Sequence, residues 1–124
     1  MRRALIIIMI FIVVFGSIAF ADNVMELEGY VLIADFQGTG IKQTESFDIP
    51  THEWAIVYIT ESHPEYGDMN FQIYVYRSKD DMLVSVAANV IGEATDYSII
   101  RGAGKHYLMI NAMQPYRIGI YCPE

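Results

Sequence analysis

The feature that most constrains this chain is its amino-terminal apolar run, because it divides an export segment from the part that must fold in water. Arg2-Arg3 precede an unbroken apolar stretch over residues 4–15, and Ala19-Phe20-Ala21 follows with small residues at both outer positions. This order of basic, apolar and small residues is typical of a secretory signal helix that is cleaved after its last small residue. We therefore expect a hydrophobic signal helix over residues 1–21 and one folded domain over residues 22–124.

An uncleaved signal-anchor is the alternative. Residues 4–20 give 17 positions interrupted only by Gly16 and Ser17, the lower limit of the roughly 17–25 residues that span a bilayer. Either interpretation predicts an exported protein, whether periplasmic, at the cell surface or extracellular. Contact with a membrane is expected only through residues 1–21, and only if they are retained.

The charge of the remaining chain narrows its partners. All fifteen acidic residues but only six of the eight basic ones follow residue 21, so residues 22–124 carry a net charge of −9. Nucleic acids and anionic lipid headgroups reward lysine and arginine. We therefore expect no nucleic-acid partner. We also predict no cofactor, and we expect the ligand to be a protein or a glycan.

Short strands punctuated by proline and glycine predict an all-β fold. The cadence of about ten residues between turn signals is typical of a sandwich or barrel, and no segment after residue 21 is a convincing helix. We predict an antiparallel β-sandwich, jelly-roll or Ig-like, with about eight strands. The predicted strands cover residues 27–36, 42–49, 54–60, 70–77, 83–91, 97–101, 106–112 and 116–121, with loops at 62–69 and 78–81.

Alternation along these strands predicts the core. Residues two apart in a strand share a face, so the apolar members of each alternating set are expected to point inward. The predicted core residues are Trp54, Ile56, Tyr58, Phe71, Ile73, Val75, Leu108, Ile110, Ile118 and Ile120.

The strand over residues 54–60 is apolar on both faces, since Ala55, Val57 and Ile59 alternate with the first set. A two-layer sandwich covers only one face of each sheet. Either this strand is central and shielded by a loop, or its outer face is a contact surface.

The pattern also resembles a known kind of domain. Phe36-x-Gly38-x-Gly40, Trp54-x-Ile56-x-Tyr58, Phe71-x-Ile73-x-Val75-Tyr76, Gly102-x-Gly104 and Tyr107-Leu108-x-Ile110 together resemble a small β-sandwich domain of secreted and membrane-attached prokaryotic proteins. The resemblance extends over nearly all of residues 22–124. It implies an accessory or binding module and transfers no active site.

No constellation of residues points strongly to catalysis. The densest polar cluster contains Glu61, His63, Glu65 and Asp68, which together offer oxygen and nitrogen ligands for a cation. The cluster lacks the alternating Asp/Asn residues and the glycine of an EF-hand loop, and it has no second histidine at helical spacing. A solvated acidic loop therefore explains it more simply. We predict no catalytic residue and no metal site, with a small secreted metal-dependent hydrolase as the remote alternative.

Cys122 is the only cysteine, so an internal disulfide is impossible and pairing with another chain is the sole option for a disulfide. Free cysteine packs like a small apolar residue. We expect Cys122 to be half-buried near the end of the last strand.

The tyrosines are the best lead to a ligand. If Phe71, Ile73 and Val75 point inward, Tyr74 and Tyr76 point outward, and the same alternation predicts an outward Tyr107 and Tyr121. Aromatic rings with a hydroxyl rim suit protein hot spots and sugar rings alike, although cross-strand tyrosine pairs also stabilise a sheet with no ligand. The leading hypothesis is a non-catalytic module that binds a protein or self-associates through a sheet face. The second is a carbohydrate-binding module that uses Tyr74, Tyr76, Tyr107 and Tyr121.

Overall fold

The computed structural model describes residues 26–124, and the predicted signal helix and cleavage site lie outside this range. Within it the chain is all-β, with antiparallel pairing throughout and no helix long and apolar enough to cross a bilayer. The strands are β1 Tyr30–Thr39, β2 Lys42–Gln43, β3 Phe47–Ile49, β4 Glu53–Thr60, β5 Asn70–Arg77, β6 Met82–Ile91, β7 Ala94–Arg101, β8 Gly104–Ala112 and β9 Pro115–Pro123.

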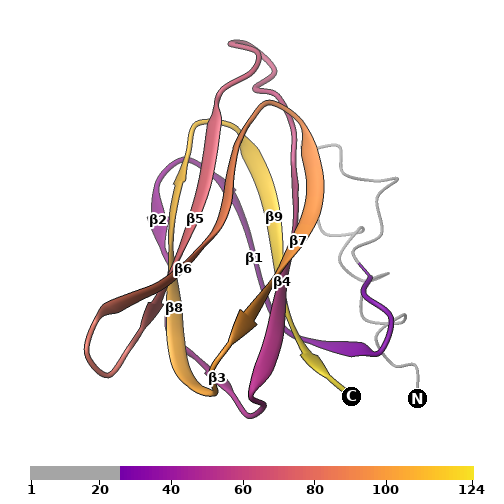
Figure 1. The fold of residues 1–124 in the computed structure, drawn as a ribbon. Helices are drawn as coiled ribbons and strands as arrows, with labels where there is room; N and C mark the ends of the chain where they lie inside the picture. The colour runs from indigo at the N-terminus through magenta and orange to yellow at the C-terminus, as the bar shows by residue number, and fades with distance from the viewer. Residues whose placement is uncertain (1–25) are drawn as a thin grey trace.

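The strands form two sheets (Figure 1). Sheet A has the order β1-β9-β4-β7, and sheet B has the order β2-β8-β5-β6 with β3 also paired to β8. Strands β6 and β7 follow each other in the chain but lie in different sheets, so the tight turn at Gly92 carries the chain from sheet B to sheet A. Ser98 Oγ donates a hydrogen bond of 2.6 Å to the Ala87 carbonyl across this corner.

The count of nine strands differs from the predicted eight because residues 42–49 are interrupted. Thr44 separates β2 from β3, and its backbone N–H donates to the Leu108 carbonyl at 2.9 Å. Its hydroxyl accepts from the Leu108 N–H at 3.0 Å. The Thr44 hydroxyl thus takes the place of a backbone acceptor in the pairing with β8, and the predicted strand is divided into two short ones. Pro50 follows the second of these strands, as expected.

Both sheets contribute to one buried cluster, and all ten predicted core residues belong to it. Ring contacts join the two sheets at both ends of this cluster. Trp54 of β4 lies 5.1 Å from His106 of β8, and Tyr58 of β4 lies 5.5 Å from Phe71 of β5, both between ring centroids. The prediction of an inward face from period-two alternation is confirmed at every position tested.

A buried glutamine joins four segments at one end of the core. Gln114 is fully buried, and its Nε2 donates to Thr60 Oγ1 at 2.9 Å and to the Gly92 carbonyl at 2.7 Å. Its Oε1 accepts from the Met69 N–H at 2.9 Å. Because a buried amide is stable only when its groups are paired, this side chain fixes where the 62–69 loop and the β6–β7 turn meet the β8–β9 turn.

Candidate functional site

Three of the four predicted ligand-contacting tyrosines lie together on the outer face of sheet B. Tyr74 and Tyr76 of β5 are register partners of Met109 and Tyr107 of β8. The rings of Tyr76 and Tyr107 stack, with centroids 5.3 Å apart and an interplanar angle of 14°. Each of these tyrosines is half-buried, which is expected of rings that stand on a sheet and lean on their cross-strand neighbours.

The Tyr107 hydroxyl is anchored at the β5–β6 turn. It donates to Asp81 Oδ1 at 3.0 Å, and desolvation together with this bond raises the pKa of Tyr107 above its ordinary value. The turn itself is stiff, since Asp80 accepts two bonds from the Arg77 guanidinium at 3.0 and 2.8 Å, which lowers the pKa of Asp80. Asp81 adopts φ 55°, a left-handed conformation that aspartate tolerates better than most residues.

Aliphatic side chains extend this aromatic surface toward the edge of sheet B. Leu83 and Val86 of β6 are the register partners of Tyr76 and Tyr74, and they are 51% and 49% exposed. We call the following outer-face set the tyrosine patch: Tyr74, Tyr76, Leu83, Val86, Tyr107 and Met109.

A row of amides borders the tyrosine patch on one side. Asn111 Nδ2 donates to Gln72 Oε1 at 2.7 Å, and Gln72 Nε2 donates to Asn89 Oδ1 at 3.1 Å. The three side chains come from β8, β5 and β6, so the row crosses the sheet at right angles to its strands. The outer face of sheet B therefore has an apolar, tyrosine-rich centre with hydrogen-bonding groups beside it.

Tyr121 is the exception, and the expectation that it faces solvent is wrong. It lies on β9 in sheet A and is fully buried. Its direction follows the predicted alternation, since it points to the outer face of its sheet, but that face is covered. Burial raises the pKa of the Tyr121 hydroxyl well above its ordinary range.

The outer face of sheet A contains a second apolar cluster. Ala55, Val57 and Ile59 of β4 are at most 7% exposed, and they group with Tyr121. Leu27, Tyr30 and Leu32 pack against them. A turn at Gly29, whose φ is +86°, is closed by a bond of 3.0 Å from the Tyr30 N–H to the Leu27 carbonyl. Of the two explanations for the doubly apolar strand, the structure favours shielding of a central strand by a neighbouring segment.

Charge is unevenly distributed between sheet B with its turns and the rest of the described residues. Sheet B with its turns, residues 42–49, 70–91 and 104–112, holds four basic and four acidic side chains. The other described residues hold two basic and ten acidic side chains. The excess negative charge of the described residues therefore lies entirely outside sheet B, and the tyrosine patch occupies the electrically neutral part of an acidic protein.

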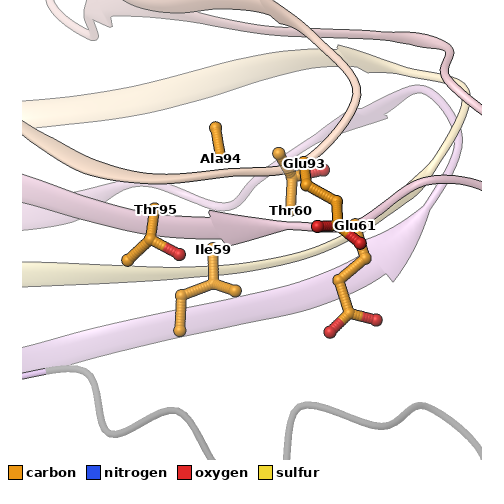
Figure 2. A pocket seen from close by; sticks show the side chains of 6 residues that line it. All are labelled: Ile59, Thr60, Glu61, Glu93, Ala94 and Thr95. Carbon is orange, nitrogen blue, oxygen red and sulfur yellow. The ribbon is translucent and has the colours of Figure 1, made fainter.

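A shallow open pocket of about 340 Å³ lies where β4 ends and β7 begins (Figure 2). Glu61 and Glu93 both line it, and desolvation together with the nearby Glu93 charge raises the pKa of Glu61. The remaining lining residues are Ile59, Thr60, Ala94 and Thr95. Two carboxylates alone make a weak cation site, and in residues 26–124 no group of three or more His, Cys, Asp or Glu side chains is placed to hold a metal.

The predicted polar cluster in the 62–69 loop is held together by its own hydrogen bonds. His63 Nδ1 accepts from the N–H groups of Glu65 and Tyr66 at 3.0 and 3.2 Å, and its ring lies against that of Tyr66 in a tilted arrangement with centroids 4.7 Å apart. Ser62 donates a hydrogen bond to Asp68. The loop residues thus satisfy one another as a structured turn.

Two further titratable groups, His106 and Cys122, are buried in the core. His106 is 2% exposed, packs on Trp54 and contacts the Gly104 carbonyl at 3.0 Å, and burial lowers the pKa of its imidazole. Cys122 is 4% exposed and belongs to the cluster shared by both sheets, so it is more buried than predicted. Burial raises the pKa of the Cys122 thiol, which suppresses the reactive thiolate.

Comparison with known proteins identifies no relative of this chain: no family model, no curated protein and no solved structure matches it. The resemblance to prokaryotic β-sandwich domains therefore stays a prediction, and the function is inferred from the chain's own geometry.

Leu83 and Val86 are the patch residues that alternation alone did not reveal. They are three positions apart, which would place them on opposite faces of a regular strand. The register between β5 and β6 shifts twice, between Ile73 and Tyr74 and between Val75 and Tyr76, so β6 carries extra residues there. Each bulge reverses the face of the residues that follow, and the sequence gives no signal for it beyond an unusually apolar edge strand.

Proposed function

We propose that this protein is an exported, non-catalytic β-sandwich module that binds a protein partner through the outer face of sheet B. The two sheets that share one core support a jelly-roll or Ig-like arrangement of the predicted kind. The observation that carries the functional proposal is the tyrosine patch, a half-exposed apolar surface on the sheet whose charges balance.

The composition of the patch supports a protein contact. Protein interfaces have a core enriched in tyrosine and methionine and depleted in charge, surrounded by a polar rim. The patch has three tyrosines, a methionine and two aliphatic residues at its centre, with the amide row on one side. Tyrosine offers a large contact area at a small cost in side-chain entropy, which is why it is frequent among binding hot spots.

The geometry of the tyrosines favours a protein over a sugar. A sugar ring stacks on the free flat face of an aromatic side chain. Here Tyr76 and Tyr107 stack on each other, and the Tyr107 hydroxyl is already bonded to Asp81. One face of each ring is therefore already occupied, and the neighbouring Leu83 and Val86 add aliphatic surface, which suits an apolar protein surface.

A partner is expected on the face of sheet B and not at its edge. Strand β6 forms one edge of the sheet, and its two bulges disrupt the regular backbone spacing that an added strand would need. The hydrogen bond from Ser98 Oγ also engages the Ala87 carbonyl of β6, so this carbonyl is already paired.

Site-specific photo-crosslinking tests this proposal. The full-length chain is produced in its native cells with benzoylphenylalanine at Val86, or at Tyr97 as a matched control of similar exposure (49% and 51%) on sheet A. We expect a discrete protein adduct from Val86 and none from Tyr97. Equal adducts from both positions, or none from Val86, would contradict the proposal. So would retention of the wild-type protein on an immobilised polysaccharide that is lost in Tyr76→Ala.

A further inference from the structure

Four connections between strands meet at one end of the molecule, which we call the loop end. They are residues 40–41, 61–69, 92–93 and 113–114, and Figure 1 shows them together on the side opposite the carboxyl terminus. Hydrogen bonds join three of them beside the buried Gln114. The Gly92 N–H donates to the Met69 carbonyl and the Met113 N–H to the Asn70 carbonyl, both at 3.0 Å. The loop end is therefore one surface built from separate segments.

The most exposed large apolar side chains of the described residues lie at the loop end. Ile91, Ile41 and Tyr66 are 74%, 72% and 68% exposed, and Met113 is 47% exposed. Each connection thus contains or directly follows one such side chain. Single exposed apolar residues are ordinary, but several on one surface mark an interaction site. Loops held by a rigid scaffold are also where binding residues concentrate.

The loop end is acidic as well as apolar. Its connections contain no lysine or arginine, and their acidic residues are Glu61, Glu65, Asp68 and Glu93. Lys42, the first residue of β2, borders them. The ion pairs of Arg77 with Asp80 and of Arg101 with Glu53 lie at the opposite end of the strands. Unbalanced carboxylates attract a positively charged partner and repel an anionic one.

We propose that the loop end is a second binding surface, which docks a segment of another protein that has apolar side chains beside its lysines or arginines. The exposed tips would contact the apolar side chains, and the carboxylates would pair with the cations. Anionic lipid headgroups would be repelled by the same carboxylates, so the charge favours a basic protein segment over a membrane. The loop end is separate from the tyrosine patch, and neither surface depends on the other.

The shallow pocket between β4 and β7 provides a place for one such cation (Figure 2). Ile59 and Ala94 supply apolar wall, and Glu61 and Glu93 supply carboxylates. A lysine or arginine side chain has an aliphatic stem and a charged head, so it matches both kinds of wall. Desolvation and the Glu93 charge raise the pKa of Glu61. A cation between the two carboxylates would offset both effects.

Selection of peptides on the protein produced from the full-length chain tests the proposal. A phage-displayed library of random peptides is the probe, and we expect the enriched peptides to place lysine or arginine beside apolar residues. Glu61→Gln combined with Glu93→Gln should weaken binding of an enriched synthetic peptide at least about 10-fold. Glu45→Gln combined with Asp48→Asn makes the same change in net charge at exposed positions away from the loop end and should change binding less than about 2-fold.

A second pair of variants separates the two binding surfaces. Ile91→Ser should weaken peptide binding at least about 5-fold, whereas Leu83→Ser, which truncates the tyrosine patch, should leave it unchanged. Near-ultraviolet circular dichroism confirms that each variant is folded.

Three results would overturn the proposal. They are enrichment of no peptide or of peptides without basic residues, peptide binding that Leu83→Ser weakens and the paired glutamine variant does not, and binding to phosphatidylcholine vesicles that Ile91→Ser abolishes. The last result would assign the loop end to a membrane. None of them affects the proposed function, because the Val86 photo-crosslink tests a different surface.

Discussion

The outer faces of the two sheets contain similar residues, but on sheet A the side chains of the central strand β4 are covered, whereas the patch on sheet B is open. Each carries tyrosine and β-branched side chains in alternation, yet Val57 on sheet A is 7% exposed and Val86 on sheet B is 49% exposed. On sheet A the segment before β1 turns at Gly29 and lays Leu27 against the sheet. No described segment does this for sheet B. An apolar strand face is therefore a core layer or an open surface according to whether a neighbouring segment covers it.

Charge is also unevenly distributed. The strands of sheet A hold three acidic and two basic side chains, whereas the other described residues outside sheet B and its turns hold seven acidic and no basic ones. Sheet B is neutral and leaves its apolar patch open.

The largest expected effect comes from a buried charge on sheet A. Val57→Asp places an unpaired carboxylate in the second cluster and should lower the free energy of unfolding by roughly 4 kcal/mol. Val86→Asp makes the same change on sheet B and should cost no more than about 1 kcal/mol. Urea unfolding monitored by Trp54 fluorescence, at concentrations where the protein is monomeric, measures both. Similar losses for the two variants would mean that the faces do not differ.

Truncating one tyrosine on each face sharpens the comparison. Tyr121→Ala removes a fully buried ring and should cost about 3–5 kcal/mol, the range for large aromatic truncations. Tyr76→Ala removes a half-buried ring that stacks on Tyr107 and should cost about 1 kcal/mol. Thermal or urea unfolding of the pair is the measurement, and a Tyr76→Ala loss as large as that of Tyr121→Ala would assign Tyr76 to the core.

As the pH falls from 7, acid should act first on the inner face of sheet B, where His106 is buried. Burial lowers the pKa of His106, so the unfolded chain binds this proton more readily than the folded one. Stability is therefore retained above the ordinary histidine value near 6.5 and falls as pH drops below it, by no more than about 1.4 kcal/mol per pH unit.

The contribution of His106 is found by substitution. His106→Asn should lower stability at pH 7 but flatten its dependence between pH 7 and 5, whereas His52→Ala, at an exposed position, should keep the wild-type profile. A His106→Asn profile as steep as the wild type would show that another group carries the acid sensitivity.

The smallest effect is expected at the rim of the patch. Tyr107→Phe removes the hydroxyl that donates to Asp81. Because this bond is exposed to water, its loss should change the free energy of unfolding by about 0.5 kcal/mol, the low end for a hydrogen bond. A loss above about 2 kcal/mol would mean that Tyr107 supports the fold in a way that the open-face account does not allow.

The sequence predicts the inner faces well because they depend on one rule. Period-two alternation assigned Trp54, Phe71 and Ile118 to the core, and the two sheets that share it make these positions unambiguous. It also placed Tyr74, Tyr76 and Tyr107 on an outer face, where they are found together.

The outer faces depend on facts that alternation does not encode. The exposure of Tyr121 is decided by a segment around Leu27 that lies far away in the sequence. The places of Leu83 and Val86 are decided by two bulges in β6. The buried role of Gln114 is decided by three segments that meet at one end of the core. The covering segment, the bulges and the glutamine contacts all depend on residues far apart in the sequence and have no local sequence signal. The covering segment and the bulges determine which apolar surface remains open.

The most direct test of the open and covered faces is thiol labelling of the folded protein. Val86→Cys and Val57→Cys are each introduced into the chain, and labelling is followed in dilute solution, where the buried Cys122 serves as an internal reference. We expect Val86→Cys to react at nearly the rate of a free thiol. Val57→Cys should be protected at least about 100-fold until urea unfolds the protein, since an opening of about 3 kcal/mol or more must precede reaction. Equal labelling of the two cysteines in the folded protein would contradict the account.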